Sequence, residues 1–245
     1  MPPGELISAL GTSAARDAMR VTAETIAVAM AAILVLGTPA AYWMSSRRGV
    51  LRDVLVTFVE LPLVLPPAVA GIGLLVAFGR AGLLGGTIDA LGIDIAFTKV
   101  AVVLAVTFVA SPFYLRTAIA AFEAVDPTLP AAARTLGAHR GRVFFRVMLP
   151  LARGGLGAGA ALAFARGLGE FGATIMFAGS LQGVTQTLSL AIYEQFDIDF
   201  DVALAISALL IVISALVLLS VKLTTRWRSG SGSLTLFAAS TRQQT

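Results

Sequence analysis

The chain contains no cysteine, a single histidine (His139) and only two lysines, Lys99 and Lys222. Without cysteine there can be no disulfide, no thiol catalysis and no cysteine-ligated metal. One histidine excludes a histidine-based zinc cluster and argues against a nucleophile–histidine triad. The chain also lacks the G-x-x-x-x-G-K-[ST] phosphate-binding loop, so nothing in it could hydrolyse ATP. The sequence therefore predicts no catalytic residues, no bound metal and no cofactor.

Charge is scarce as well. Only 13% of the 245 residues are charged and 57% are hydrophobic, with a mean hydropathy of +0.88, whereas a soluble domain is about one quarter charged. Several apolar runs approach or exceed the ~20 residues that a spanning helix needs. We therefore expect an all-α, polytopic membrane protein in contact with lipid. The pI near 10.1 could suggest nucleic-acid binding, but basic residues also collect on the cytoplasmic side of membrane proteins, so no nucleic-acid partner is expected.

The apolar runs predict five transmembrane helices, at about 21–44, 54–78, 98–118, 154–178 and 201–221. Residues 1–20 are polar and lack the apolar core of a cleaved signal peptide, so we expect them to form an N-terminal extracytoplasmic segment. Residues 21–222 would then form one permease domain. Residues 223–245 are rich in Ser, Gly and Gln and should form a flexible cytoplasmic tail.

The charges of the loops predict the orientation. Basic residues gather after the first span, between the third and fourth spans, and after the fifth, whereas the other two loops are mainly acidic. The basic segments contain Arg47, Arg48, Arg52, Arg116, Arg134, Arg140, Arg142, Arg146, Arg153, Lys222, Arg226, Arg228 and Arg242. The other two loops contain Arg80, Asp89, Asp94, Glu194, Asp197, Asp199 and Asp201. Basic loops face the cytoplasm. The N-terminus should therefore lie outside and the C-terminus inside.

The second span contains three prolines shortly after a glutamate: Glu60, Pro62, Pro66 and Pro67. Each proline removes a helix hydrogen bond, which neighbouring helices or water must replace. Such a helix belongs inside a bundle or beside a pore. Two interpretations stay open: a kinked packing helix, or a helix that lines the substrate path.

The fourth span is rich in small residues, including the Gly155 and Gly159 pair, which let membrane helices approach closely. It also carries Arg166 and Glu170, which would lie one turn apart on one helix face. Charges at this depth are expensive and usually pair or face an aqueous path. The two residues are thus either an internal ion pair that locks helices together or part of a translocation path.

Residues 120–153 predict a cytoplasmic segment with two short helices. Asp126 and Pro127 are typical of a helix start, and Gly137 of a helix end; between them one apolar face is formed by Leu129, Ala132, Ala133 and Leu136. A second amphipathic piece follows and should stop at Pro150. By itself this pattern could equally be a solvated loop.

The spacing in this segment resembles the cytoplasmic loop of binding-protein-dependent ABC importer permeases. Their pattern is Glu-Ala-Ala, three residues, Gly, nine residues, Ile, one residue, Leu-Pro; the matching residues here are Ala132, Ala133, Gly137, Val147, Leu149 and Pro150. Val147 replaces the Ile, and Ala131 stands where the family usually has Glu, a carboxylate thought to help engage the ATPase. The resemblance implies that these residues, with Arg134 and Leu136, form an ATPase-coupling segment.

Further blocks resemble molybdate permeases in particular: residues 61–67, 132–138, 162–174 and 185–188. Sulfate permeases share close versions, but they more often read Gly-Glu-Tyr-Gly-Ser where this chain has Gly169-Glu170-Phe171-Gly172-Ala173, and they tend to be longer. The first expectation is therefore molybdate, with tungstate and sulfate as alternatives.

The resemblance implies a type I ABC importer permease of the bacterial inner membrane that forms the path for a small oxyanion. Its expected partners are a second copy of itself, two ABC ATPase subunits and an extracytoplasmic oxyanion-binding protein. A stand-alone secondary transporter, with Glu60 and Glu170 as coupling acids, is the alternative outside this family. An intramembrane aspartyl protease is disfavoured, because no span contains a well-placed pair of aspartates.

Overall fold

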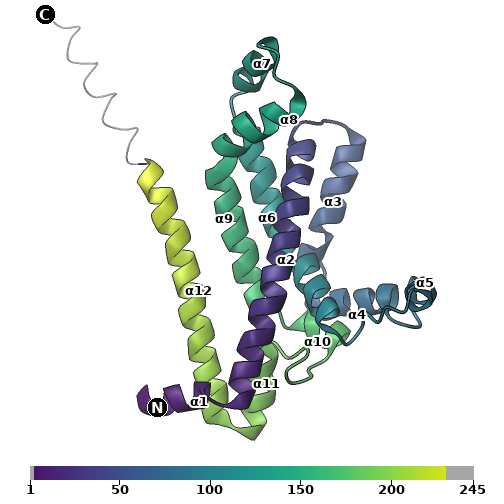
Figure 1. Ribbon diagram of the computed structural model, residues 1–245, viewed down its shortest axis with the longest axis vertical. Coiled ribbons are helices and arrows are strands. Elements are labelled where there is room, and N and C mark those ends of the chain that lie inside the picture. Colours follow the sequence, from purple (N-terminus) through teal and green to yellow (C-terminus); the bar gives the residue numbers. More distant parts are fainter. Residues whose placement is uncertain (1–2, 230–245) are drawn as a thin grey trace, which may run out of the picture.

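The computed structural model describes residues 3–229, and within them every regular element is helical. Figure 1 shows a bundle of long helices with shorter ones at both ends. The elements are α1 (Pro3–Leu10), α2 (Ser13–Ser45), α3 (Val50–Val64), α4 (Pro67–Phe78), α5 (Gly85–Ala90), α6 (Lys99–Glu123), α7 (Thr128–Thr135), α8 (Arg140–Val143), the π-helix η1 (Phe144–Met148), α9 (Leu149–Leu168), α10 (Gly172–Ala178), α11 (Leu188–Ile198) and α12 (Phe200–Ser229).

Four helical stretches are long and apolar enough to cross a membrane: Ser13–Ser45, Lys99–Glu123, Arg140–Leu168 and Phe200–Ser220. The pair Val50–Val64 and Pro67–Phe78 makes a fifth if it counts as one broken span, because its two helices meet at an angle of 118°. The expected all-α fold with about five membrane helices is therefore confirmed.

The first long helix begins eight residues before the expected start of the first span, because Thr12 caps it and its side chain accepts from the Ala15 N–H. Its 33 residues extend over about 50 Å, against about 30 Å of hydrocarbon. The polar residues Arg16, Asp17 and Arg20 therefore belong to this helix without lying in the hydrocarbon. Within the expected N-terminal segment, α1 is a short helix that packs on α2 and α12.

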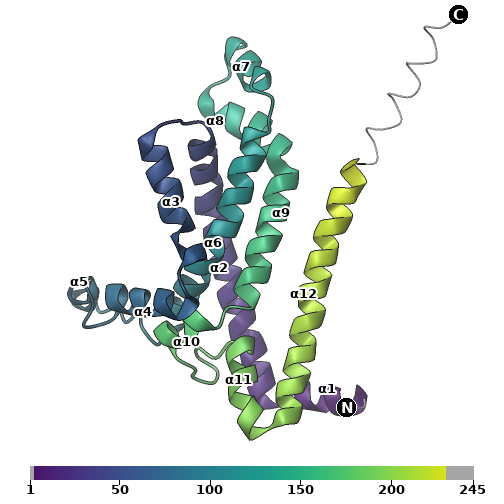
Figure 2. The ribbon, with the colours of Figure 1, turned by 180° about the vertical axis from the view of Figure 1, so that it is seen from behind.

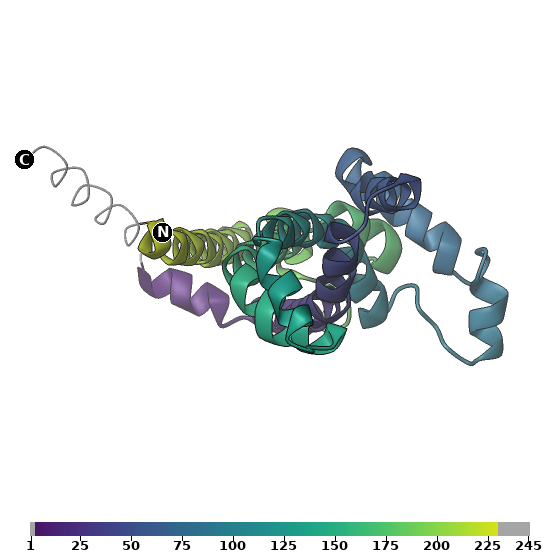
Figure 3. The same cartoon turned by 90° about the horizontal axis from the view of Figure 1, so that it is seen from above.

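The second expected span is broken where three prolines were noted. α3 ends at Val64, Leu65 and Pro66 are extended, and α4 starts at Pro67. Pro67 is tolerated in the first turn of α4, where its missing N–H has no partner to lose. Seen from above, α4 and α5 extend away from the bundle (Figure 3).

The fifth span stands to one side. α12 packs on α9, α11 and α1, and Figure 2 shows its upper part separate from the other long helices. The helix continues to Ser229, so residues 223–229 of the expected flexible tail are helical. Residues 230–245 of that tail lie outside the described residues.

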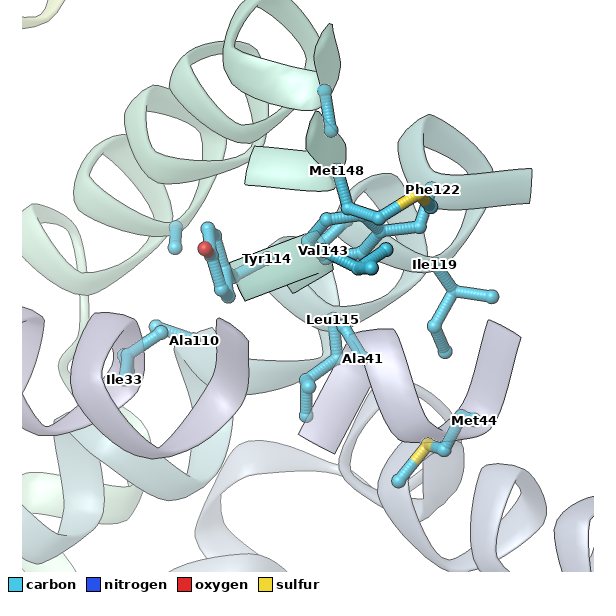
Figure 4. Close-up of a cluster of buried hydrophobic side chains, with 13 residues drawn as sticks. Ile33, Ala41, Met44, Ala110, Tyr114, Leu115, Ile119, Phe122, Val143 and Met148 are labelled. Carbon is cyan, nitrogen blue, oxygen red and sulfur yellow. The ribbon is translucent and has the colours of Figure 1, made fainter. Parts of the chain in front are cut away.

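The core joins α2, α6 and the helices after α7. Figure 4 shows Met44, Leu115, Ile119, Phe122, Val143 and Met148 in one buried cluster with Tyr114 and small residues. Small side chains permit this packing: Gly37 of α2 lies against the ring of Tyr114, and a Cβ there would come within 3.1 Å of that ring.

Candidate functional site

The helix α7 projects at one end of the bundle (Figure 1), and none of its residues is buried. Asp126 lies just before it and accepts hydrogen bonds from the Thr128 backbone N–H and hydroxyl, at 2.9 and 2.8 Å. These bonds hold the pKa of the Asp126 carboxyl below its usual value. The helix begins at Thr128, one residue after the expected Pro127, but the Asp126 side chain still caps its first turn.

Gly137 ends the turn after α7 in the left-handed region, with φ of +82°. Its N–H donates to the Arg134 carbonyl at 2.9 Å, and the next N–H, of Ala138, donates to the Ala133 carbonyl at 3.0 Å. An added Cβ at Gly137 would meet nothing within 4 Å. The requirement for glycine is therefore conformational, because L side chains are penalised at this φ.

Leu136 is 88% exposed and Leu129 is 46% exposed on this helix. Ala131, Ala132 and Arg134 are exposed as well, whereas Ala133 packs partly against the core. Of the expected apolar face, Leu136 is thus almost fully open and Leu129 about half covered within the described chain. With Arg134 they form an exposed, partly apolar surface at this end of the bundle.

The piece after α7 does not stop at Pro150 as expected. Helix α8, capped by His139 through its Nδ1, runs through η1 into α9 without a break, from Arg140 to Leu168. The wider π turn closes with a bond from the Leu149 N–H to the Phe144 carbonyl. It lies directly before Pro150, where a regular α-helix would press the proline ring against the carbonyl four residues earlier.

This continuous helix is anchored to the core. Val143 and Met148 are buried against α2 and α6, and Val147 packs partly against them. The rings of Tyr42 and Phe144 lie 4.9 Å apart, and Tyr42 also contacts Phe122 at 5.5 Å. A displacement of α7 would therefore be passed to α9 and α6 through packed side chains.

The fourth expected span is also broken, and its second half crosses α4. α9 ends at Leu168 and a separate helix, α10, begins at Gly172. A Cβ on Gly71 of α4 would lie 2.5 Å from the Ala173 carbonyl oxygen, and one on Gly172 would lie 2.7 Å from Pro67 Cβ. The two broken spans therefore rest on each other through small residues, with Pro67 in the contact.

Arg166 and Glu170 meet at the break between α9 and α10. Arg166 Nη2 lies 2.7 Å from Glu170 Oε2; the side chain of Glu170 is 1% exposed and that of Arg166 27%. The other carboxylate oxygen of Glu170 accepts from the Ala173 N–H at 2.7 Å, at the start of α10. Glu170 was expected on the same helix as Arg166, but Gly169 ends α9 before it. Its carboxylate thus fastens the second helix to the first.

Glu60 pairs with a residue that the sequence had placed in the cytoplasmic loop. Glu60 Oε1 lies 3.1 Å from Arg116 Nε, and the two side chains are 37% and 62% exposed. Arg116 lies within α6, seven residues before its end at Glu123. Glu60 lies ten residues after the start of α3, where a carboxylate needs a cationic partner. A search of the sequence for such a partner could have suggested Arg116. Pro62 lies on the same helix and is half-buried.

A further link was missed because its members are far apart in sequence. Arg52, at the start of α3, donates to Glu123 Oε1 at 2.8 Å, contacts Asp53, and donates to the Met44 carbonyl. It therefore ties α2 and α3 to the last residue of α6, which precedes α7. No group of three or more potential metal ligands occurs within residues 3–229.

The family model described as the inner membrane component of binding-protein-dependent transport systems matches residues 17–228. The chain is 48% identical over 210 residues to a molybdenum transport system permease protein of Mycobacterium bovis, covering 86% of this chain and 80% of the relative. It is 42% identical to a probable molybdenum ABC transporter permease protein of Haloferax volcanii, covering 86% and 83%.

Among solved structures, a bacterial alginate ABC transporter in complex with a periplasmic protein that holds an alginate pentasaccharide has a similar chain. The TM-score is 0.69 at 14% identity, over 91% of this chain and 81% of that one. At this identity the likeness concerns the fold alone.

Proposed function

Since the chain belongs to the family of inner membrane components of binding-protein-dependent transport systems, we propose that it is the permease subunit of an ATP-driven importer for molybdate. The carrying observation is the 48% identity, over 86% of the chain, to a molybdenum transport permease. As a permease subunit it is not an enzyme, and a separate ATPase subunit supplies the energy.

The ATPase docks on α7. This helix has a capped start, a left-handed glycine end and exposed leucines at 129 and 136. Ala131 provides no carboxylate to the contact, so Arg134 and the leucines carry it. The continuous helix from Arg140 to Leu168 then passes the movement of the ATPase to the core. Alternating access is thus driven by a subunit that lies outside the membrane.

The remaining partners are a second copy of the chain and an extracytoplasmic oxyanion-binding protein. The orientation is N-terminus outside and C-terminus inside. Two features support it: the basic loop after α2 lies at the same end as α7, and the acidic connection between α11 and α12 lies at the other end (Figures 1 and 2). The solved alginate transporter binds its periplasmic protein, which supports delivery of the anion from that side.

A secondary transporter is the less favoured function. Its coupling acids would have to exchange protons or ions, but Glu60 lies 3.1 Å from Arg116 and Glu170 lies 2.7 Å from Arg166. Each acid thus has an arginine as its neighbour within the described chain, and neither stands alone in the way that a coupling acid would.

The test is uptake of radiolabelled molybdate by cells in which the gene is disrupted and then restored. We expect uptake from low external molybdate to be lost on disruption and recovered with the wild-type gene. Excess unlabelled tungstate and sulfate serve as competitors and rank the three anions. Unchanged molybdate uptake after disruption would overturn the proposal, and loss of sulfate uptake instead would move it to the sulfate branch.

A further inference from the structure

One face of α6 is left open between its neighbours. α9 covers the adjoining face, since Gly159 lies against Thr117 and Gly155 against Ala121. α3 approaches from the other edge through the Glu60 contact with Arg116. Between these two contacts Arg116 and Ala120 remain exposed.

The same face is closed toward the other end of α6. Val106 and Val109 are buried there with Ala173 and Phe177 of α10 and Leu74 of α4. The crossed helices α4 and α10 therefore form a floor across this face. The open part lies between that floor and the end that carries α7.

A lipid-facing position does not suit Arg116. It lies seven residues from the end of α6, about 10 Å along the helix, and α6 is long enough to cross the hydrocarbon with little to spare. An arginine and a glutamate exposed at that depth cost free energy in lipid and normally face an aqueous path or another polar surface. Their exposed fractions of 62% and 37% thus indicate a face that meets water or the polar surface of another subunit.

Arginine is well suited to hold an oxyanion. Its planar guanidinium presents several N–H donors, so it can bind an anionic oxygen while one nitrogen stays on a carboxylate. In the described chain Nε of Arg116 lies 3.1 Å from Glu60 Oε1, and the Arg116 side chain is 62% exposed. One carboxylate cannot accept from all five N–H donors of a guanidinium, so this exposed side chain keeps donors for an anion.

We propose that Arg116 binds the divalent oxyanion on the α7 side of the α4–α10 floor, and that Glu60 positions it and competes with the anion. This inference rests on the proposed function, because it needs an oxyanion in the path. Glu60 keeps the arginine extended when the path is empty and weakens the hold on the anion, so that the anion can leave to the cytoplasm.

The experiment measures molybdate transported per ATP hydrolysed by the complete wild-type and variant transporters in proteoliposomes. Loss of the charge-assisted contact in Arg116→Gln should lower this ratio by about tenfold or more. Arg116→Lys should retain a larger part of it. Glu60→Gln should lower it by much less, about threefold at most, and bind molybdate more tightly, because the competing carboxylate is gone. Arg20→Gln is the matched control, since Arg20 is also an exposed arginine paired with a glutamate; it should transport like wild type.

The double variant Glu60→Gln with Arg116→Gln separates a binding role from a structural latch. If Arg116 binds the anion, the double variant stays as low as Arg116→Gln. Recovery of transport in the double variant, equal losses in the two single variants, or a wild-type ratio in Arg116→Gln would each overturn the inference. If wild type itself transports none of the three oxyanions, the proposed function fails instead.

Discussion

The arginine–glutamate pair of Arg166 with Glu170 and that of Arg116 with Glu60 have different surroundings. Glu170 is 1% exposed, contacts Arg166 at 2.7 Å and also accepts from the Ala173 N–H. Glu60 and Arg116 are 37% and 62% exposed and share one contact at 3.1 Å. A buried carboxylate with two partners fixes the geometry of a helix break, whereas an exposed pair with one contact can admit a ligand. Burial thus distinguishes the structural pair from the pair that we propose binds the anion, and the spacing of residues in the sequence does not reveal burial.

The largest effect should come from the buried pair. Glu170→Ala leaves Arg166 without its partner and removes the cap of α10, and breaking a buried pair costs about 3–5 kcal/mol. We expect poor assembly, measured by size-exclusion chromatography in detergent, and a lower melting temperature of the purified protein. The double neutral variant Arg166→Met with Glu170→Gln should be milder, because no uncompensated charge remains. A double variant as poorly assembled as Glu170→Ala would contradict the pairing.

The exposed pair should matter much less for stability. Glu60→Gln or Arg116→Gln should cost about 1 kcal/mol or less, the usual value of an exposed ion pair. The same melting measurement checks this, and Arg20→Gln serves as its reference. A loss as large as that of Glu170→Ala would mean that the pair of α3 and α6 also holds the fold together, and the contrast between the two pairs would disappear.

The smallest effect concerns the start of α7, outside the bundle. Asp126→Ala removes the acceptor for Thr128 and should speed amide hydrogen exchange in the first turn of α7 only. The pKa of Asp126 is lowered in the folded state, so its contribution is present above the unfolded pKa and is lost as pH falls through the folded pKa. Exchange in the variant, compared with wild type at the same pH, should thus differ at neutral pH and converge in acid. Equal exchange at neutral pH would mean that Asp126 does not cap α7.

Hydropathy predicted most of the fold, because spanning helices must satisfy their backbone internally. The breaks were harder. Three prolines indicated the bend after Val64. The residue spacing did not indicate that a π turn would let the helix continue through Pro150. The separate helix α10 depends on Glu170 as its cap and on Gly71 as its contact, and these two residues are 99 positions apart.

The same limit applies to the site. The residues from Ala132 to Pro150 that we propose for coupling follow a local spacing, so a sequence pattern could suggest them. Arg116 was counted among the loop charges, and its pairing with Glu60 on another helix could not be seen from local spacing. Arg52 and Glu123 are likewise 71 positions apart. Contacts between distant segments decide these roles, and one sequence by itself does not reveal them.

The central claim is that α7 couples the permease to a separate ATPase, and the most direct measurement uses Gly137→Asp. Asp would be strained at φ of +82° and would add a charge at the docking surface, while the spans stay untouched. Co-purification with the partner ATPase and uptake of labelled molybdate into membranes are measured together, after normal insertion has been verified. We predict that both are lost. Retention of both activities would mean that α7 is an ordinary surface segment, and would contradict the account.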